Sequence, residues 1–246
     1  MKQPHIQLDE TVHATCALLP GDPARLNHIV EQLEAVQELA FNREFRSLKG
    51  FYKGMPVLAV STGIGGSSAA IAIEELHAIG VDAMIRIGSC GALQSFINLG
   101  DLIFACGVIR DEGTSKAYVD IAYPAVPDNA LLQHCIHIAR EEKWPHHTGI
   151  VHSHESFYID QNDAIEAGWS KLGVLGSDME SAALFTVGRL RHIATASILN
   201  NVVTYGQDTA DAIAGYVDGA KACAQGERRE IHVALEALYR FKGQAA

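Results

Sequence analysis

The sequence predicts an α/β fold: a single domain over residues 1–246, in which helices flank a central mixed, mostly parallel sheet. Short β-branched runs alternate with helical patterns along most of the chain, which is typical of that class. A length of 246 residues is one that a single α/β domain commonly reaches. No Pro- or Ser-rich linker, internal repeat or composition shift divides the chain.

The alternation defines the expected elements in order. Short apolar runs predict strands at residues 56–61, 83–87, 102–109, 148–153 and 193–199. Helical patterns predict helices at residues 67–79, 128–142, 179–190 and 226–241. Ligands of such sheets bind outside the carboxyl ends of the strands, so we expect the site residues in the turns that follow strands.

The chain is acidic, with 19 Lys and Arg against 29 Asp and Glu and a formal net charge of −10. Phosphate backbones and anionic lipids repel such a chain, so neither nucleic acid nor a membrane is an expected partner. Five scattered cysteines without a Cys-x-x-Cys pair favour reduced thiols. Residues 1–10 do not resemble a signal peptide and the apolar runs are too short to span a bilayer, so we expect a cytoplasmic protein.

A glycine-rich turn, Ser61-Thr-Gly-Ile-Gly-Gly-Ser-Ser, connects the first of these strands to its helix. Such a turn can bind a dinucleotide, and Asp82 lies at a spacing suited to a ribose. However, Ser68 replaces the third glycine of that pattern, and about fifty residues precede the strand. A tight turn between a strand and a closely packed helix is therefore the better interpretation.

Three arginines lie beside glycines or turns. Arg86 ends an apolar strand in Arg86-Ile-Gly-Ser-Cys-Gly-Ala, Arg25 follows the turn Pro20-Gly-Asp-Pro-Ala-Arg, and Arg43 lies in Asn42-Arg-Glu-Phe. Each alone could be a solvated side chain or an ion-pair partner. Together, in an acidic chain, they suggest the cluster that binds an oxyanion such as phosphate.

Two carboxylates, Asp178 and Glu180, precede an apolar helix. They could complement the charge at the helix N-terminus, or one of them could accept hydrogen bonds from sugar hydroxyls. The local sequence leaves both interpretations open.

Nearly the whole chain, from about His5 to the last expected helix, resembles the nucleoside phosphorylase family with a single α/β domain, and most closely its uridine phosphorylase branch. Six motifs occur in the order of that family: Pro20-Gly-Asp-Pro-Ala-Arg, Asn42-Arg-Glu-Phe, Ser61-Thr-Gly-Ile-Gly-Gly-Ser-Ser, Arg86-Ile-Gly-Ser-Cys-Gly-Ala, Ser156-Phe-Tyr and Asp178-Met-Glu-Ser-Ala. The resemblance implies phosphorolysis, in which a nucleoside and phosphate give the free base and ribose 1-phosphate. It implies no metal or redox cofactor, with inorganic phosphate as co-substrate.

The resemblance also implies roles for individual residues. Arg86, Glu180 and Arg25 are the implied catalytic residues. The implied phosphate ligands are Gly21, Arg25, Arg43, Arg86 and Ser89, with Ser89 where relatives often have Thr. The implied ribose ligands are His5, Met179 and Glu180.

Arg43 and His5 are expected to reach into the site of a neighbouring subunit. A homo-oligomer with shared sites is therefore implied, with a dimer as the unit and a hexamer as the full assembly. Glu44 and Ser68 match positions that hold a monovalent cation at the dimer interface in some relatives.

The base pocket departs from the uridine branch. Its expected members are Cys90, Gly91, Phe157, Gln161, Asp163 and Asn200. Asp163 stands where that branch usually has Arg, and a carboxylate cannot donate to a pyrimidine carbonyl. Asn200 stands where the purine-type bacterial branch has Asp, and an amide could read a 6-oxopurine or a pyrimidine. We expect uridine, because the flanking motifs match that branch better, with a purine nucleoside such as inosine or guanosine as the alternative.

Other functions compete less well with these residues. A nucleoside hydrolase of the same fold would lack the phosphate arginines, and a nucleoside-binding protein without activity would not need Arg86 or Glu180. The histidine pairs His152/His154 and His134/His137 could ligate zinc, but no cysteine or carboxylate set completes such a site.

Overall fold

The computed structural model describes residues 1–206 and 220–244. Within that part the strands form one sheet in the order β2-β3-β4-β1-β5-β8-β7-β6-β9. In chain order the strands are β1 Cys16–Pro20, β2 Glu34–Asn42, β3 Phe45–Tyr52, β4 Met55–Val60, β5 Ala83–Ala92, β6 Leu102–Asp111, β7 His146–His154, β8 Gly176–Asp178 and β9 Ala194–Val203. Because β9 pairs with both β5 and β6, the five strands from β5 to β9 form a closed ring of pairings.

The sheet is mixed, as the sequence predicts. Parallel pairs join β1 to β4 and β5, β5 to β9, β6 to β7 and β7 to β8. Antiparallel pairs join β2 to β3, β3 to β4, β5 to β8 and β6 to β9. The parallel pair of β1 and β5 brings the turns after these two strands to one edge of the sheet.

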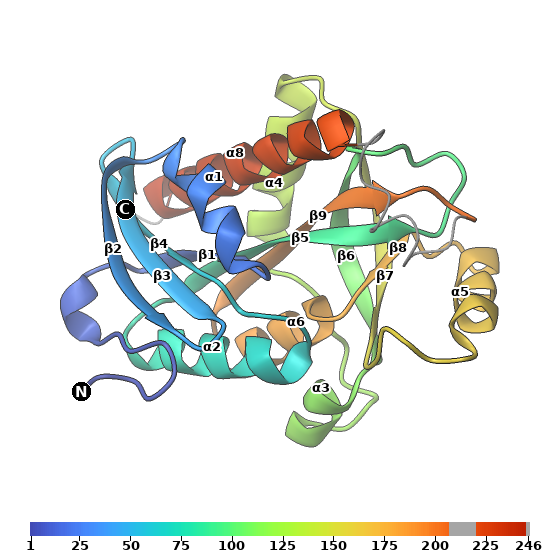
Figure 1. Ribbon diagram of the computed structural model, residues 1–246, viewed down its shortest axis with the longest axis horizontal. Helices are drawn as coiled ribbons and strands as arrows, with labels where there is room; N and C mark the ends of the chain where they lie inside the picture. The colour runs from blue at the N-terminus through green and yellow to red at the C-terminus, as the bar shows by residue number, and fades with distance from the viewer. Residues whose placement is uncertain (207–219, 245–246) are drawn as a thin grey trace.

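Helices cover both faces of the sheet, with α4 and α8 on one side and α2, α3 and α6 on the other (Figure 1). The helices are α1 Leu26–Val30, α2 Gly66–Ala78, α3 Gly113–Tyr118, α4 Asn129–Glu141, α5 Asn162–Lys171, α6 Ser181–Leu190 and α8 Ala220–Gln244, with short 3-10 helices at Glu10–Val12 and Pro23–Arg25. No helix in the described residues is long and apolar enough to cross a membrane.

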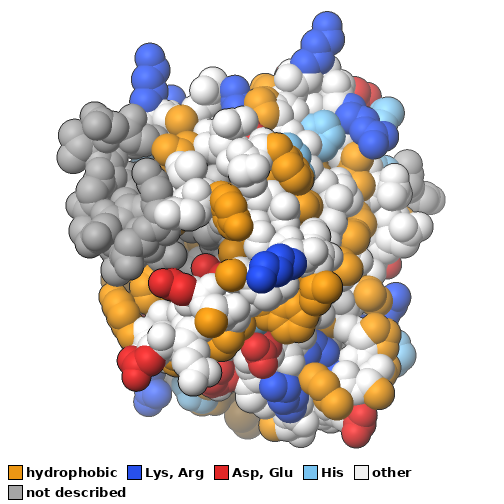
Figure 2. Space-filling view, turned by 90° about the vertical axis from the view of Figure 1, so that its right-hand side faces the viewer, with side chains coloured by type: hydrophobic (Ala, Val, Ile, Leu, Met, Phe, Trp, Pro, Cys, Tyr) orange, Lys and Arg blue, Asp and Glu red, His pale blue; other side chains and the backbone are white. Residues whose placement is uncertain are grey.

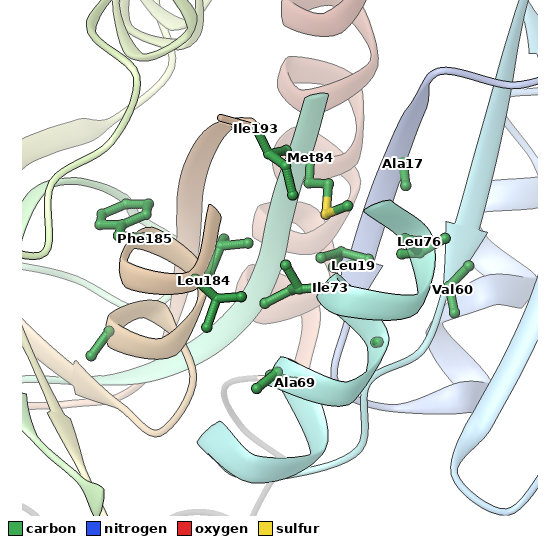
Figure 3. Close-up of a cluster of buried hydrophobic side chains, with 14 of the residues drawn as sticks. Ala17, Leu19, Val60, Ala69, Ile73, Leu76, Met84, Leu184, Phe185 and Ile193 are labelled. Atoms are coloured by element: carbon green, nitrogen blue, oxygen red, sulfur yellow. The ribbon is translucent and has the colours of Figure 1, made fainter. Parts of the chain in front are cut away.

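Each face of the sheet buries its own apolar core. Along β5, Met84 packs into the core on the α2 and α6 side, whereas Ile85 packs into the core under α4 and α8. Figure 3 shows the first core, in which Ile73 of α2 and Leu184 of α6 lie close to Met84. Successive side chains of a strand point to opposite faces, so continuous apolar runs such as that of β5 suit a strand that is buried on both faces.

All of the strands and helices expected from the sequence are present, with shifts at their ends. The strand expected at residues 83–87 continues as β5 to Ala92, and Asp128 is the N-cap of α4, where its carboxylate accepts from the backbone N–H of Leu131. The hairpin of β2 and β3 was not expected, since β2 is largely exposed and carries polar residues. The short elements α3, α5 and β8 were also not expected.

The glycine-rich turn after β4 requires its glycines. Gly63 has a φ of 70° and Gly65, the N-cap of α2, a φ of 93°, a region that side chains with a Cβ rarely adopt. The turn directs the backbone N–H of Gly65 to a carboxylate oxygen of Glu180, 2.5 Å away. The turn therefore connects the α2 side of the sheet to the cavity described below.

The close contact of α8 with the sheet gives a first prediction. A Cβ at Gly226 of α8 would lie 2.9 Å from the Cα of Gly100 and still closer to the side chain of Asn200. We expect Gly226→Ala to lower the free energy of unfolding by about 1–3 kcal/mol, because backbone and a buried amide would have to move.

The measurement is urea unfolding of both proteins beside a matched control in the same helix. A Cβ at Gly243 meets nothing within 4 Å, so Gly243→Ala should change stability by less than about 0.5 kcal/mol. Equal effects of the two substitutions would contradict the close packing of α8 against Asn200.

Candidate active site

A cavity of about 790 Å³ lies at the carboxyl ends of β1, β5 and β8. Most of the residues that the sequence predicts for the site line this cavity. They are Gly21, Arg25, Glu44, Ser68, Arg86, Ser89, Cys90, Gly91, Phe157, Met179 and Glu180. The structure thus brings together segments that are up to 159 residues apart in the chain, as the rule for parallel sheets predicts.

Arg86 is the most deeply buried cation of this cavity, with only 5% of its surface exposed. Its Nε donates to Asp178 Oδ2 at 3.0 Å, and its Nη2 lies 2.5 Å from Glu180 Oε2. Its Nη1 is buried and makes no hydrogen bond to any described residue. Burial by itself lowers the pKa of an arginine, but here the carboxylates of Glu180 and Asp178 raise it, so Arg86 stays charged.

Gly88 makes this orientation of Arg86 possible. The guanidinium folds back along its own strand, and a Cβ at Gly88 would lie 2.6 Å from Arg86 Nη2. Any side chain at that position would displace the guanidinium from Glu180. The Arg-Ile-Gly spacing is therefore needed for the geometry of the site.

Asp178 and Glu180 have different roles, which the sequence could not separate. Asp178 accepts from the backbone N–H and the hydroxyl of Ser181, from Ser153 and from Arg86, so it caps α6 and holds the guanidinium. Glu180 makes no capping bond to α6 and lines the cavity. Burial raises the pKa of Glu180, and the nearby charge of Arg86 opposes that rise.

Arg25 forms the second cationic group of the cavity. It ends the 3-10 helix Pro23–Arg25, and its Nη2 donates to Ser89 Oγ at 2.9 Å while its Nη1 donates to the carbonyl oxygen of Ile87. Two carboxylates of α8 lie behind it, with Glu230 Oε1 3.3 Å from Nη1 and Glu227 Oε2 3.6 Å from Nε. Arg25 is thereby fixed beside Arg86 on one side of the cavity.

Sequence reasoning missed Glu230, whose side chain is wholly buried under Arg25. Within residues 1–206 and 220–244, neither of its carboxylate oxygens makes a side-chain hydrogen bond, and burial raises its pKa to about 8. Nothing in the local sequence marks it, because an acidic residue in an amphipathic helix is ordinarily exposed.

Two residues that the sequence assigns to a neighbouring subunit's site lie outside the cavity of their own chain. His5 Nδ1 lies 2.6 Å from Glu75 Oε1, and Arg43 is exposed in the turn between β2 and β3. Their roles across a subunit boundary stay predictions. Glu44 and Ser68, the expected cation ligands, are hydrogen-bonded to each other at 2.6 Å. Within residues 1–206 and 220–244 there is no group of three or more His, Cys, Asp or Glu side chains that could hold a metal ion.

Of the residues predicted for the base pocket, three do not line the cavity. Gln161 and Asp163 are exposed at the start of α5. Asn200 is buried and donates to the carbonyl oxygen of Cys223, so it faces α8 and not the cavity. Phe157 does line it, and four residues that the sequence analysis did not select lie there too: His154, Asn162, Glu166 and Ser177.

The side of the molecule that carries α5 faces the viewer in Figure 2, where hydrophobic side chains lie between scattered charged ones. Tyr158, between Phe157 and α5, is 84% exposed, and Leu172 at the end of α5 is 75% exposed. Apolar side chains are therefore exposed on either side of α5.

Comparison with known proteins identifies the family. The family model of the phosphorylase superfamily matches residues 15–215. The chain belongs to this superfamily. It is 35% identical to guanosine phosphorylase of Halorubrum lacusprofundi over 96% of this chain and 98% of that protein, and 41% identical to uridine phosphorylase of Thermococcus kodakarensis over 82% and 78%.

Among solved structures, uridine phosphorylase from Vibrio fischeri ES114 superimposes with a TM-score of 0.92. It is 47% identical in sequence, and the match covers 97% of this chain and 98% of that one. The resemblance to nucleoside phosphorylases, with uridine phosphorylases among the similar proteins, is thus confirmed, as is the α/β fold class.

The buried carboxylate under Arg25 predicts a pH dependence of stability. A carboxyl whose folded-state pKa is near 8 keeps its proton in the folded protein while the unfolded chain loses it from about pH 4.5 upward, so its contribution to stability falls between those values. Glu230→Gln cannot ionise. Its stability relative to the wild type should therefore rise as the pH increases from 5 to 8.5.

Thermal unfolding of both proteins at several pH values measures this difference. A Glu230→Gln difference that is the same at pH 5 and pH 8.5 would show that Glu230 does not change its protonation on folding.

Proposed function

We propose that this protein catalyses the reversible phosphorolysis of a nucleoside, with uridine as a substrate. The observation that carries the proposal is the group of Arg25, Ser89 and Arg86 on one side of a single cavity, with Glu180 beside Arg86. Membership of the phosphorylase superfamily and the similarity to uridine phosphorylases support the same activity.

The two arginines provide the phosphate site. Arg25 and Arg86 offer charge-assisted donors to a dianion, and Nη1 of Arg86 has N–H groups that none of the described residues accepts from. The backbone N–H of Gly21 and the hydroxyl of Ser89 are further donors in the cavity lining. A phosphate bound there is fixed in position before it reacts, which removes part of the entropy cost of the encounter.

Glu180 provides the ribose side of the site. Its carboxylate lies in the cavity wall and can accept from the sugar hydroxyls, while Met179 contributes an apolar surface beside it. As the bond from C1′ to the base breaks, the base takes the electron pair and positive charge develops on the sugar. Glu180 and the phosphate dianion stabilise that charge, and a phosphate oxygen then bonds to C1′.

Guanosine is the second candidate substrate. The Halorubrum lacusprofundi relative, which matches this chain along nearly its full length, is a guanosine phosphorylase. The three base-pocket residues proposed from sequence, Gln161, Asp163 and Asn200, do not line the cavity, so they provide no argument for either base.

The proposed reaction requires phosphate. We expect release of uracil from uridine only when phosphate is present, with ribose 1-phosphate as the second product, because the arginines bind phosphate and no carboxylate is needed to activate water. Chromatography of uridine reactions with and without phosphate measures both products. Uracil released equally fast in phosphate-free buffer would instead indicate a hydrolase, and binding of uridine without turnover a nucleoside-binding protein.

We also propose that two subunits share each site, with Arg43 and His5 contributed by the neighbour, in dimers that assemble to a hexamer. Arg43 is exposed at the tip of the hairpin of β2 and β3, where it can reach another chain. Glu44, the next residue in this turn, accepts from Ser68, and both residues line the cavity.

Mixing two inactive variants tests the shared site. Arg43→Ala and Glu180→Gln each disable a different half of the site, so subunit exchange between them should restore part of the activity, because some mixed sites regain both side chains. The control is each variant mixed with itself. No recovery in a mixture whose subunits have demonstrably exchanged would place both residues in the site of one chain.

A further inference from the structure

From the proposed function and the base end of the cavity, we infer that Glu166 determines base specificity: its carboxylate accepts from adjacent N–H groups on the base edge, which makes guanosine a preferred substrate beside uridine. The proposal depends on the nucleoside chemistry proposed above and adds to it the group that reads the base. Glu166 lines the cavity but was not selected from the sequence.

The register of the sheet places Glu166 away from the phosphate end. Ser89 and Gly91 follow Arg86 along β5, at about 3.3 Å per residue. Gly91 pairs with Ser177 of β8, and the hydroxyl of Ser177 donates to Glu166 Oε1 at 2.9 Å. The cavity wall therefore runs from the phosphate arginines along β5 to Glu166, with room between them for a ribose.

The Ser177 hydrogen bond orients the carboxylate of Glu166 but occupies only one of its oxygens. Oε2 makes no hydrogen bond to any described residue, and it is not among the described buried atoms that lack a partner. A merely structural role in tying α5 to β8 leaves that oxygen unused. It is therefore available to a ligand in the cavity.

His154 adds a second acceptor to the same wall. Its Nδ1 lies 3.0 Å from the carbonyl oxygen of Ser156, and because a carbonyl can only accept, Nδ1 carries the hydrogen. A neutral His154 then presents Nε2 as an acceptor. Among the described residues that line the cavity, the Arg and Lys side chains are Arg25 and Arg86, which both lie at the phosphate end.

The edges of the two candidate bases differ in what they offer to this wall. Guanine has N1–H next to its 2-amino group, so two adjacent donors can meet one carboxylate. Uracil has N3–H between two carbonyl oxygens, so the second carboxylate oxygen would face an acceptor. Asn162 lies four residues before Glu166 and on the same face of α5. Its amide can donate to a carbonyl oxygen, which both bases carry, so Asn162 does not discriminate between guanine and uracil.

The experiment measures guanosine and uridine with the wild type and with Glu166→Gln. The amide keeps one acceptor and gains a donor that suits a uracil carbonyl. We expect the ratio of kcat/KM for guanosine to that for uridine to exceed one in the wild type and to fall roughly ten- to a hundredfold in the variant. The matched control is Glu142→Gln at the exposed end of α4, which should leave the ratio unchanged.

Equilibrium binding of both nucleosides in phosphate-free buffer separates this inference from the proposed function. If the wild type binds guanosine more tightly than uridine and Glu166→Gln abolishes that difference, the inference is supported. It is supported even if no phosphorolysis occurs, and the lack of phosphorolysis would contradict only the proposed function. Active uridine phosphorolysis with a guanosine-to-uridine ratio that Glu166→Gln leaves unchanged would overturn the inference. If Glu166→Gln does not fold, Ser177→Ala is the second variant, because it removes the hydrogen bond that orients the carboxylate of Glu166. It should weaken the binding of guanosine more than that of uridine. Equal effects on both nucleosides would overturn the inference as well.

Discussion

The ion pairs of Arg86 with Asp178 and Glu180 are the interaction on which the rest of the site depends. A guanidinium with 5% exposure is stable there only because two carboxylates lie beside it, and each carboxylate is in turn held by the backbone, Asp178 by the start of α6 and Glu180 by the Gly65 turn. Three separate segments therefore meet at one charged group. Removing Arg86 would leave two buried carboxylates without a compensating cation, and breaking a buried ion pair in this way typically costs about 3–5 kcal/mol.

The ion pairs that fix Arg86 also determine which end of the cavity carries the cationic side chains. Arg86, within β5, and Arg25, in the 3-10 helix after β1, lie at one end of the cavity, where they offer donors to the anionic co-substrate proposed above. The opposite end, between β8 and α5, presents Glu166 and His154 without a facing arginine or lysine among the described residues. An anion and a base edge rich in N–H donors are thus the chemical groups that suit the two ends of one elongated site.

Local patterns predicted strands such as β5, helices such as α2, and the two arginines that line one cavity, Arg25 and Arg86. They succeeded there because the ligand-binding segments of a parallel sheet follow its strands and their residues are contiguous. Local patterns did not predict side-chain contacts that depend on the packing of segments far apart in the chain. Asn200 turns toward α8 because Cys223 offers a carbonyl there, and no local signal at either residue indicates that contact. No helix was predicted at α5, so the cavity-lining pair Asn162 and Glu166, which a four-residue helical spacing relates, was missed. The predicted residues of that segment, Gln161 and Asp163, are exposed instead. The proposed roles of His5 and Arg43 depend on a neighbouring subunit, and one sequence alone does not show where that subunit lies.

The central claim, that Arg86 anchors phosphate while two carboxylates hold it, is tested most directly by the thermal unfolding of the protein at increasing phosphate concentration. A ligand that binds only the folded state raises the unfolding temperature with its concentration. The account predicts such a rise for the wild type and a much smaller one for Arg86→Lys, because lysine keeps the charge but lacks the planar donors that meet two carboxylates and a phosphate together. Equal rises in the two proteins, with potassium chloride at matched ionic strength as the reference, would contradict it.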